Sequence, residues 1–233
     1  MNARYLPLLF LFPWFAHSQL PELSPVLGQR GDLIHSADFD SPDARPPETK
    51  LGKCEIIAGA LRLEERQADH HQAAVSLYRV GSTGHTEPLT DFLMQADFQW
   101  SGAKNFQFGL NRLPALAKKA TDGKHWEVAP HCLTIAFRQP SDPQKPREWV
   151  VDDNSVEPFL CLGKLPVTLE PGKWYRILLE VRRNEVCVQL SNGQTIRGQA
   201  KNPNDPKSAP ILRCQGEEGK GVTLDNVQVW KVR

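Results

Sequence analysis

The stretch PGKWYRILLEVRRNEVCVQLSNGQTIRG, residues 171–198, constrains the fold more than any other part of the chain. Apolar residues take every second position over Tyr175–Val181 and again over Val186–Leu190. Because the side chains of a strand point alternately to opposite faces, this rhythm predicts adjacent antiparallel strands. Arg183-Asn184 and Asn192-Gly193 are the expected turns between them. Asn192-Gly193 suits a two-residue type I′ turn, in which both residues need positive φ.

Short alternating segments of the same kind recur along the chain, separated by Gly, Pro, Asp and Asn. They are EIIAGALRLEE, AAVSLYRV, DFLMQADFQW, NFQFGLNR, CLTIAFRQ, EWVVDD, APILRCQG and GVTLDNVQVWKV. A first strand is expected around Ile34–Phe39, and only Arg112–Gly123 has a helical composition. Many short strands between turn signals predict an all-β fold, a two-sheet sandwich or a barrel, with at most one short helix.

The N-terminus MNARYLPLLFLFPWFAHS has the pattern of a secretory signal. Arg4 precedes an apolar core over Tyr5–Phe15, and small residues follow where a signal peptidase needs them. The core is about 11 residues long, well short of the ~20 that span a bilayer, although an uncleaved anchor remains the alternative. We therefore predict a signal peptide at 1–18, a flexible lead-in at 19–32 and one domain at 33–233. The mature protein would be secreted, periplasmic or in the cell envelope, with no membrane span.

The charge of the chain argues against nucleic-acid binding, and the spacing of its cysteines argues against a zinc or redox motif. The formal net charge is +1 and no basic run occurs, which argues against a nucleic-acid partner. The cysteines are Cys54, Cys132, Cys161, Cys187 and Cys214. No CxxC pair exists among them, which argues against a zinc or redox motif. Two disulfides with one leftover thiol, or five separate thiols packed as small apolar residues, both remain open.

Three successive segments, DFLMQADFQW, NFQFGLN and CLTIAFR, each combine an apolar face with a polar one. If they are neighbouring strands, their polar side chains share one face of a sheet. These side chains include Gln95, Asp97, Gln107, Asn111 and Arg138. Water commonly covers such a face in an antiparallel sheet. The alternative is a concave glycan-binding face, because short amides and carboxylates bond sugar hydroxyls and lose little entropy when ordered.

Trp126 and Trp149 lie in or beside expected loops. An exposed indole there could stack on a sugar ring, and the alternative is that both cap the edge of the core. Trp100, Trp174 and Trp230 fall within or at the start of strands and are expected to pack in the sheets.

Catalytic signatures are sparse. No G-x-S-x-G, H-E-x-x-H or E-x-D-x-E spacing occurs. His70, His71, His125 and His131 flank expected strands, so they could meet at one rim of a sheet for proton transfer or metal binding, or could simply be solvated. Asp152-Asp153-Asn154 offers oxygen ligands that calcium could use, but such triplets are common in turns. No cofactor is expected.

The segments LEPGKWYRILLEVRRNEVCVQLSNGQTIRG and GVTLDNVQVW resemble the end of concanavalin A-like, laminin-G-like sandwich domains. The nearest resemblance is to bacterial exported domains of the 3-keto-disaccharide hydrolase type. SADFD and GALRLEE near the N-terminus fit the same pattern. The resemblance implies a jelly-roll of two curved antiparallel sheets and a carbohydrate-related role outside the cytoplasm. It carries over no catalytic residue, because the E-x-D-x-E triad of related glucanases is absent.

We therefore expect an exported sandwich that binds or processes a glycan or glycoside on a concave polar face. If the protein is catalytic, we expect it to hydrolyse or eliminate an oxidised (3-keto) sugar, with Asp97, His71 or His131 as acid or base. Gln95, Gln107, Asn111 and Arg138 would position hydroxyls, with Trp126 and Trp149 nearby. One alternative is a non-enzymatic interaction domain that contacts protein partners or the cell envelope. Another is an enzyme with a metal at the histidine rim.

Overall fold

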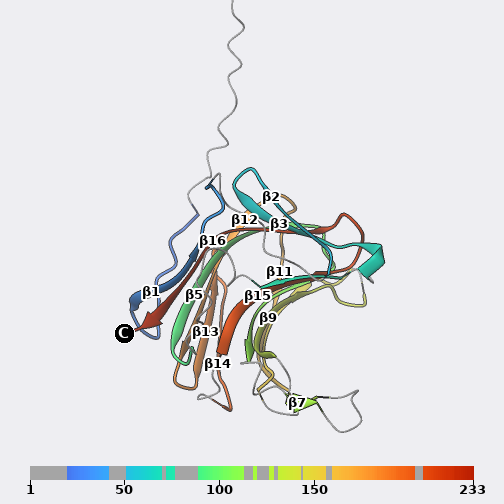
Figure 1. The fold of residues 1–233 in the computed structure, drawn as a ribbon. Coiled ribbons are helices and arrows are strands. Elements are labelled where there is room, and N and C mark those ends of the chain that lie inside the picture. Colours follow the sequence, from blue (N-terminus) through green and yellow to red (C-terminus); the bar gives the residue numbers. More distant parts are fainter. Residues whose placement is uncertain are drawn as a thin grey trace, which may run out of the picture.

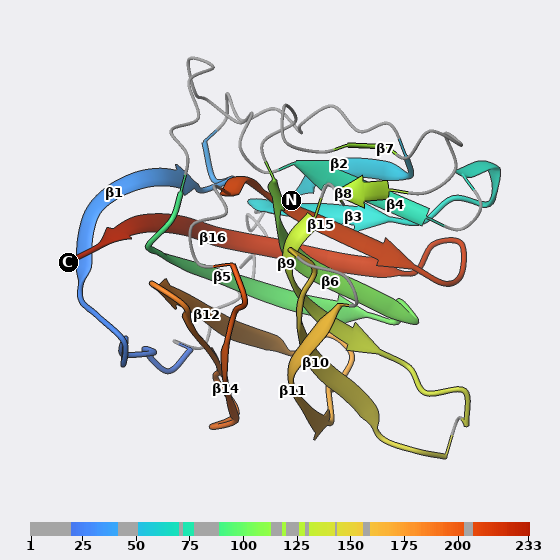
Figure 2. The same ribbon diagram turned by 90° about the horizontal axis from the view of Figure 1, so that it is seen from below.

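Two antiparallel β-sheets pack face to face around a hydrophobic core (Figure 1, Figure 2). The computed structural model describes residues 20–41, 51–69, 72–76, 89–112, 118–119, 126–128, 131–142, 144–155, 159–202 and 207–233. In these residues the only helical element is one 3-10 turn, η1 (Gln67–Asp69), and no helix is long and apolar enough to cross a membrane. The prediction of an all-β two-sheet sandwich is confirmed.

The larger sheet has eight strands. Its order is β14-β13-β12-β5-β16-β3-β2, and β1 also pairs with β16. The strands are β1 (Arg30–Ala37), β2 (Lys53–Ile57), β3 (Ala60–Glu64), β5 (Phe92–Ser101), β12 (Trp174–Arg182), β13 (Glu185–Leu190), β14 (Thr195–Gln199) and β16 (Gly221–Val232). β1 begins at Arg30, earlier than the first strand expected from the sequence.

The predicted meander is β12-β13-β14, in which Ile177 faces Leu190 and Val188 faces Ile196. The second turn differs from its prediction. The Gly193 amide donates to the Leu190 carbonyl and the Leu190 amide donates to the Gln194 carbonyl, both at 2.9 Å. The loop therefore has three residues, and Gly193 carries the positive φ of +89°. A type I turn closed by a left-handed glycine replaces the expected two-residue type I′ turn.

The smaller sheet has six strands in the order β11-β10-β9-β6-β15-β4. They are β4 (Gln72–Ser76), β6 (Asn105–Arg112), β9 (His131–Arg138), β10 (Arg147–Asp153), β11 (Leu160–Val167) and β15 (Lys207–Gln215). β7 (Lys118–Lys119) pairs with β8 (Trp126–Val128) as a separate hairpin. Lys118–Lys119 is thus a strand within the segment predicted as helical, and most of that segment lies outside the described residues.

An aromatic cluster joins the two sheets at the centre of the core. The Phe98 ring, on β5, lies 5.4 Å from the rings of Phe106, Phe108 and Phe137 on β6 and β9. Phe106 and Phe137 stack at 4.5 Å. These side chains are all but fully buried, so the alternate residues of β6 and β9 must point away from the core, to the outer face of the six-stranded sheet.

The five cysteines are all free thiols, which answers the question that their spacing left open. Cys132, Cys187 and Cys214 are buried, and burial raises the pKa of the Cys187 thiol to about 11. Buried thiols of this kind behave as small apolar side chains.

Arg183, in the turn between β12 and β13, has a φ of +55°. The left-handed region costs a residue with a Cβ roughly 1 kcal/mol. Arg183→Gly should therefore raise the free energy of unfolding by about 0.5 kcal/mol, after the greater freedom of glycine in the unfolded chain is counted. Urea unfolding measures the change. Arg182→Gly, within β12, is the control and should lower stability; a loss of stability in both variants would contradict the assignment.

Candidate binding site

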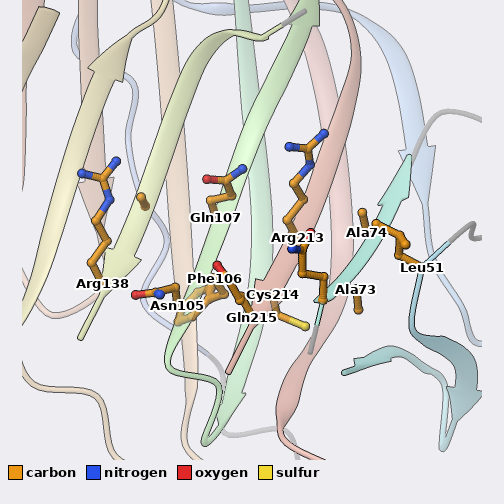
Figure 3. Close-up of a pocket in the computed structure, with 12 residues that line it drawn as sticks. Leu51, Ala73, Ala74, Asn105, Phe106, Gln107, Arg138, Arg213, Cys214 and Gln215 are labelled. Atoms are coloured by element: carbon orange, nitrogen blue, oxygen red, sulfur yellow. The ribbon is translucent and has the colours of Figure 1, made fainter. Parts of the chain in front are cut away.

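A hollow of about 420 Å³ lies on the outer face of the six-stranded sheet (Figure 3). Strands β4, β6, β9 and β15 supply almost all of its lining. The lining residues are Leu51, Gln72, Ala73, Ala74, Asn105, Phe106, Gln107, Ala136, Arg138, Arg213, Cys214 and Gln215.

The hollow arises from side chains of unequal length in one row across the sheet. Arg213 is paired with Gln107 on one side and with Ala74 on the other, and Gln107 is paired with Ala136. Because Ala74 and Ala136 are short, the long side chains between them stand above open space. Figure 3 shows Arg138, Gln107 and Arg213 side by side and pointing the same way.

A second row of side chains lies two residues further along the strands, on the same face, and adds amide groups to the hollow. Asn105 is paired with Arg138 and with Gln215, and Gln215 is paired with Gln72. The Asn105 Oδ1 atom accepts a hydrogen bond from the Gln139 amide at 3.1 Å, which fixes this side chain. The two rows together present amide donors and acceptors around two guanidinium groups.

The two arginines of the hollow differ in their electrostatic environment. Arg138 pairs with Asp152 of β10 at 2.5 Å. Arg213 is half-buried, and in the described part of the chain it has no carboxylate partner. Burial alone lowers the pKa of the Arg213 guanidinium, whereas a neighbouring carboxylate would raise it.

Two of the residues predicted to bind substrate, Gln107 and Arg138, lie together in this hollow. Gln95 and Asp97 do not, because β5 pairs with β12 and β16 in the other sheet. The expectation that all three polar segments share one face is therefore wrong. Alternation reveals the two faces of each strand, but it does not reveal which sheet the strand joins.

Asp97 is held in a network of its own on the eight-stranded sheet. Its carboxylate accepts two hydrogen bonds from Arg176, at 2.6 and 2.8 Å, and one from the Asn226 amide at 3.1 Å. The residue is only 4% exposed. Gln95 accepts a hydrogen bond from Arg30 at 2.9 Å. Both predicted site residues therefore hold protein groups in place.

Trp149 lies inside the core and not beside a loop. It belongs to β10, has no exposed surface, and its ring stacks on that of Phe137 at 6.1 Å. This position corrects the prediction that its indole could stack on a sugar. Trp126 begins β8, but nothing of its side chain is described.

The remaining predicted residues fall wholly or partly outside the described part of the chain. Asn111 belongs to β6 and His131 begins β9, but their side chains are not described. His70, His71 and His125 lie outside the described residues, as do residues 1–18.

The acidic triplet Asp152-Asp153-Asn154 is engaged by protein groups. Asp152 pairs with Arg138, and Asp153 accepts hydrogen bonds from the amide and hydroxyl of Ser155 at 2.9 and 2.5 Å. Among the residues that the structure describes, no three His, Cys, Asp or Glu side chains gather closely enough to hold a metal ion.

Sequence reasoning missed Arg213 and Gln215. Both belong to β15, whose sequence alternates Ile211, Arg213 and Gln215 outward with Leu212 and Cys214 buried in the core. The alternation in APILRCQG could have indicated a polar face. Only the pairing of β15 between β6 and β4 brings that face beside Gln107.

Chemically, the described lining can bind but offers no acid–base pair. It contains amides and guanidinium groups, and no carboxylate or imidazole. The Cys214 thiol is directed to the core, where it donates to the Leu63 carbonyl at 3.7 Å. Such a lining recognises hydroxyls and anions through hydrogen bonds.

Solved structures share this fold. A Bacillus subtilis protein of unknown function with a galectin-like fold aligns with a TM-score of 0.62 at 14% identity, covering 89% of this chain and 100% of its own. The CBM2 module of the evolved Dit protein of Lactobacillus casei BL23 phage J-1 aligns at 0.59 and 10% identity, over 89% and 99%. Carbohydrate binding module CBM66 from Bacillus subtilis aligns at 0.51 and 9% identity, over 81% and 98%.

These likenesses establish a galectin-like sandwich, in agreement with the concanavalin A-like jelly-roll expected from the sequence. At such low identity they bear on the fold alone. No family model matches the sequence, and no curated protein matches it.

Proposed function

We propose that this chain is a glycan-binding domain and that the glycan lies in the hollow over β4, β6, β9 and β15. The observation that carries the proposal is the row Ala136, Gln107, Arg213 and Ala74, in which two hydrogen-bonding side chains rise beside short ones. Sugar hydroxyls both donate and accept hydrogen bonds, and amides offer both functions within one side chain. The free space above the alanines gives a sugar ring room to lie against the sheet.

The comparisons support the same ligand class. Two of the solved structures named above are carbohydrate-binding modules, and each is covered almost completely by its alignment to this chain.

The proposal favours binding over hydrolysis. Glycoside hydrolysis usually needs two carboxyl groups flanking the scissile bond. The described lining has none, and Asp97 lies on the other sheet in a network with Arg176. Turnover of a 3-keto sugar, which the family resemblance implies, would need groups beyond the described side chains, such as those of His71 or His131.

We propose that the chain is exported, which fits this function. Residues 1–18 would form the signal peptide and residues 19–32 the lead-in to the binding domain, and the last residues of this lead-in, from Arg30, already belong to β1. A glycan-binding module acts where polysaccharides are found, in the cell envelope or outside the cell.

A glycan array followed by calorimetry tests the proposal. Gln107→Ala should weaken binding of the best glycan about tenfold, since it removes one or two hydrogen bonds of about 1 kcal/mol each. Gln199→Ala changes an exposed glutamine on β14 of the other sheet and should leave the affinity unchanged. An array without a single bound glycan would contradict the function and favour the interaction-domain alternative. Equal affinities for both variants and the parent would contradict the site.

A further inference from the structure

The binding of a neutral sugar would not account for the charge of Arg213 in the hollow. It sits in the middle of β15, half-buried between Gln107 and Ala74. Burial lowers the pKa of its guanidinium because the charged group has lost part of its hydration. A buried charge is costly unless an ion pair or hydrogen bonds offset the loss.

The acidic side chains of β10, three strands away from β15 in the same sheet, are already paired with other residues. Asp152 of β10 binds Arg138 at 2.5 Å, and Glu148 of the same strand binds Lys164 at 2.6 Å. The described lining itself contains no Asp or Glu. Among the described residues, the positive charge of Arg213 therefore has no counter-ion in the hollow, in the row where a ligand would lie.

The shape of this group indicates what would complement it. A guanidinium is a planar fork that binds a carboxylate through two parallel hydrogen bonds. Gln107, the neighbour of Arg213 across the strand pair, points the same way in Figure 3 and can donate its amide to the same anion. Ala74 on the other side is too short to block the approach.

We propose that the ligand of this hollow is an acidic glycan, and that Arg213 binds the carboxylate of a uronic acid residue. The inference rests on the proposed function and specifies its ligand class. Arg138, already neutralised by Asp152, is left to bond hydroxyls or the ring oxygen of an adjoining sugar.

The test uses ligand pairs that differ only in charge. Calorimetry with the purified chain compares oligogalacturonate, oligoglucuronate and oligomannuronate, each beside its methyl ester, together with a sulfated neutral oligosaccharide. At least one acid should bind tenfold or more tightly than its ester and than the sulfated sugar, because a charge-assisted pair is lost in the ester. This preference should shrink as sodium chloride is raised.

Variants assign the preference to Arg213. Arg213→Gln should bring the acid-to-ester affinity ratio close to one, and Arg213→Lys, which keeps the charge but not the fork, should give an intermediate ratio. Arg183→Gln changes an exposed arginine in the β12–β13 turn, at the edge of the other sheet, and should leave the ratio unchanged. Without ligand, Arg213→Gln should be at least as stable to urea as the parent, because it removes an unpaired charge.

The outcomes separate the two proposals. An ester or a sulfated sugar that binds as tightly as the acid would overturn the uronate assignment, and so would an Arg213→Gln variant that keeps the full preference. If neutral glycans alone bind and Gln107→Ala weakens them, the proposed function stands and this inference falls. If no acidic or neutral glycan binds, the proposed function itself fails.

Discussion

Glu65→Gln should raise the free energy of unfolding by roughly 3 kcal/mol above pH 7 and change it little below pH 4.5. Glu65 follows β3 and is 1% exposed. Within the part of the chain that the structure describes, neither of its carboxylate oxygens accepts a hydrogen bond of normal geometry. Burial, and then the nearby Glu217 carboxylate, raise the pKa of Glu65 from 4.5 to about 7, although the Glu217 amide and Lys104 act in the opposite direction.

The sign of the pH dependence follows from proton binding in the two states. Between pH 4.5 and 7 the folded chain keeps the Glu65 proton while the unfolded chain releases it, so the stability of the parent falls as the pH rises through this window. Glutamine is neutral throughout, so its curve lacks this fall. Urea unfolding at pH 4.5, 6, 7 and 8 measures both proteins.

A matched control lies in the neighbouring β15–β16 loop, whose Gly219 amide donates to the Glu65 carbonyl at 3.4 Å. Glu218→Gln replaces an exposed carboxylate and should change the stability only slightly. If the Glu65→Gln and parent curves ran parallel across the window, the raised pKa of Glu65 would be refuted.

The strands themselves were predictable because their side chains alternate. The polar positions of β6 and β9 were correctly grouped, since these strands pair directly and Gln107 faces Ala136 across the pair. Trp149 was misplaced because EWVVDD alternates poorly: Val150 and Val151 are both buried, so the period of two does not identify the core face.

Sheet membership could not be predicted, because it depends on pairing between distant segments. β5 and β6 are consecutive in the chain, yet β5 lies between β12 and β16 and β6 lies between β9 and β15. The chain crosses from one sheet to the other between Ser101 and Asn105. A local pattern contains no information about such a crossing, and this is why Asp97 was grouped with the hollow and Arg213 was missed.

The contacts of the segment before β1 could not be predicted either, because they join residues that are distant in the sequence. Glu180 of β12 is fully buried, and its carboxylate accepts hydrogen bonds from the Val26 amide at 2.9 and 3.0 Å and from the Leu27 amide at 2.9 Å. Gln189 donates to Glu180 at 3.1 Å and to the Ser24 carbonyl at 2.8 Å. These bonds hold residues 24–27 against the eight-stranded sheet, close to where Arg30 binds Gln95.

Glu180→Ala should therefore lower the free energy of unfolding by about 3 kcal/mol, because it removes several charge-assisted hydrogen bonds and leaves their donors unpaired. Glu180→Gln keeps one acceptor oxygen but turns an amide group toward backbone donors, so its loss should be smaller. Limited trypsin digestion should cleave Glu180→Ala after Arg30 faster than the parent, since the segment is no longer held. Glu185→Ala, an exposed glutamate of β13, should match the parent in both assays. Cleavage at the parental rate in Glu180→Ala would show that other contacts hold the segment and that the carboxylate is dispensable.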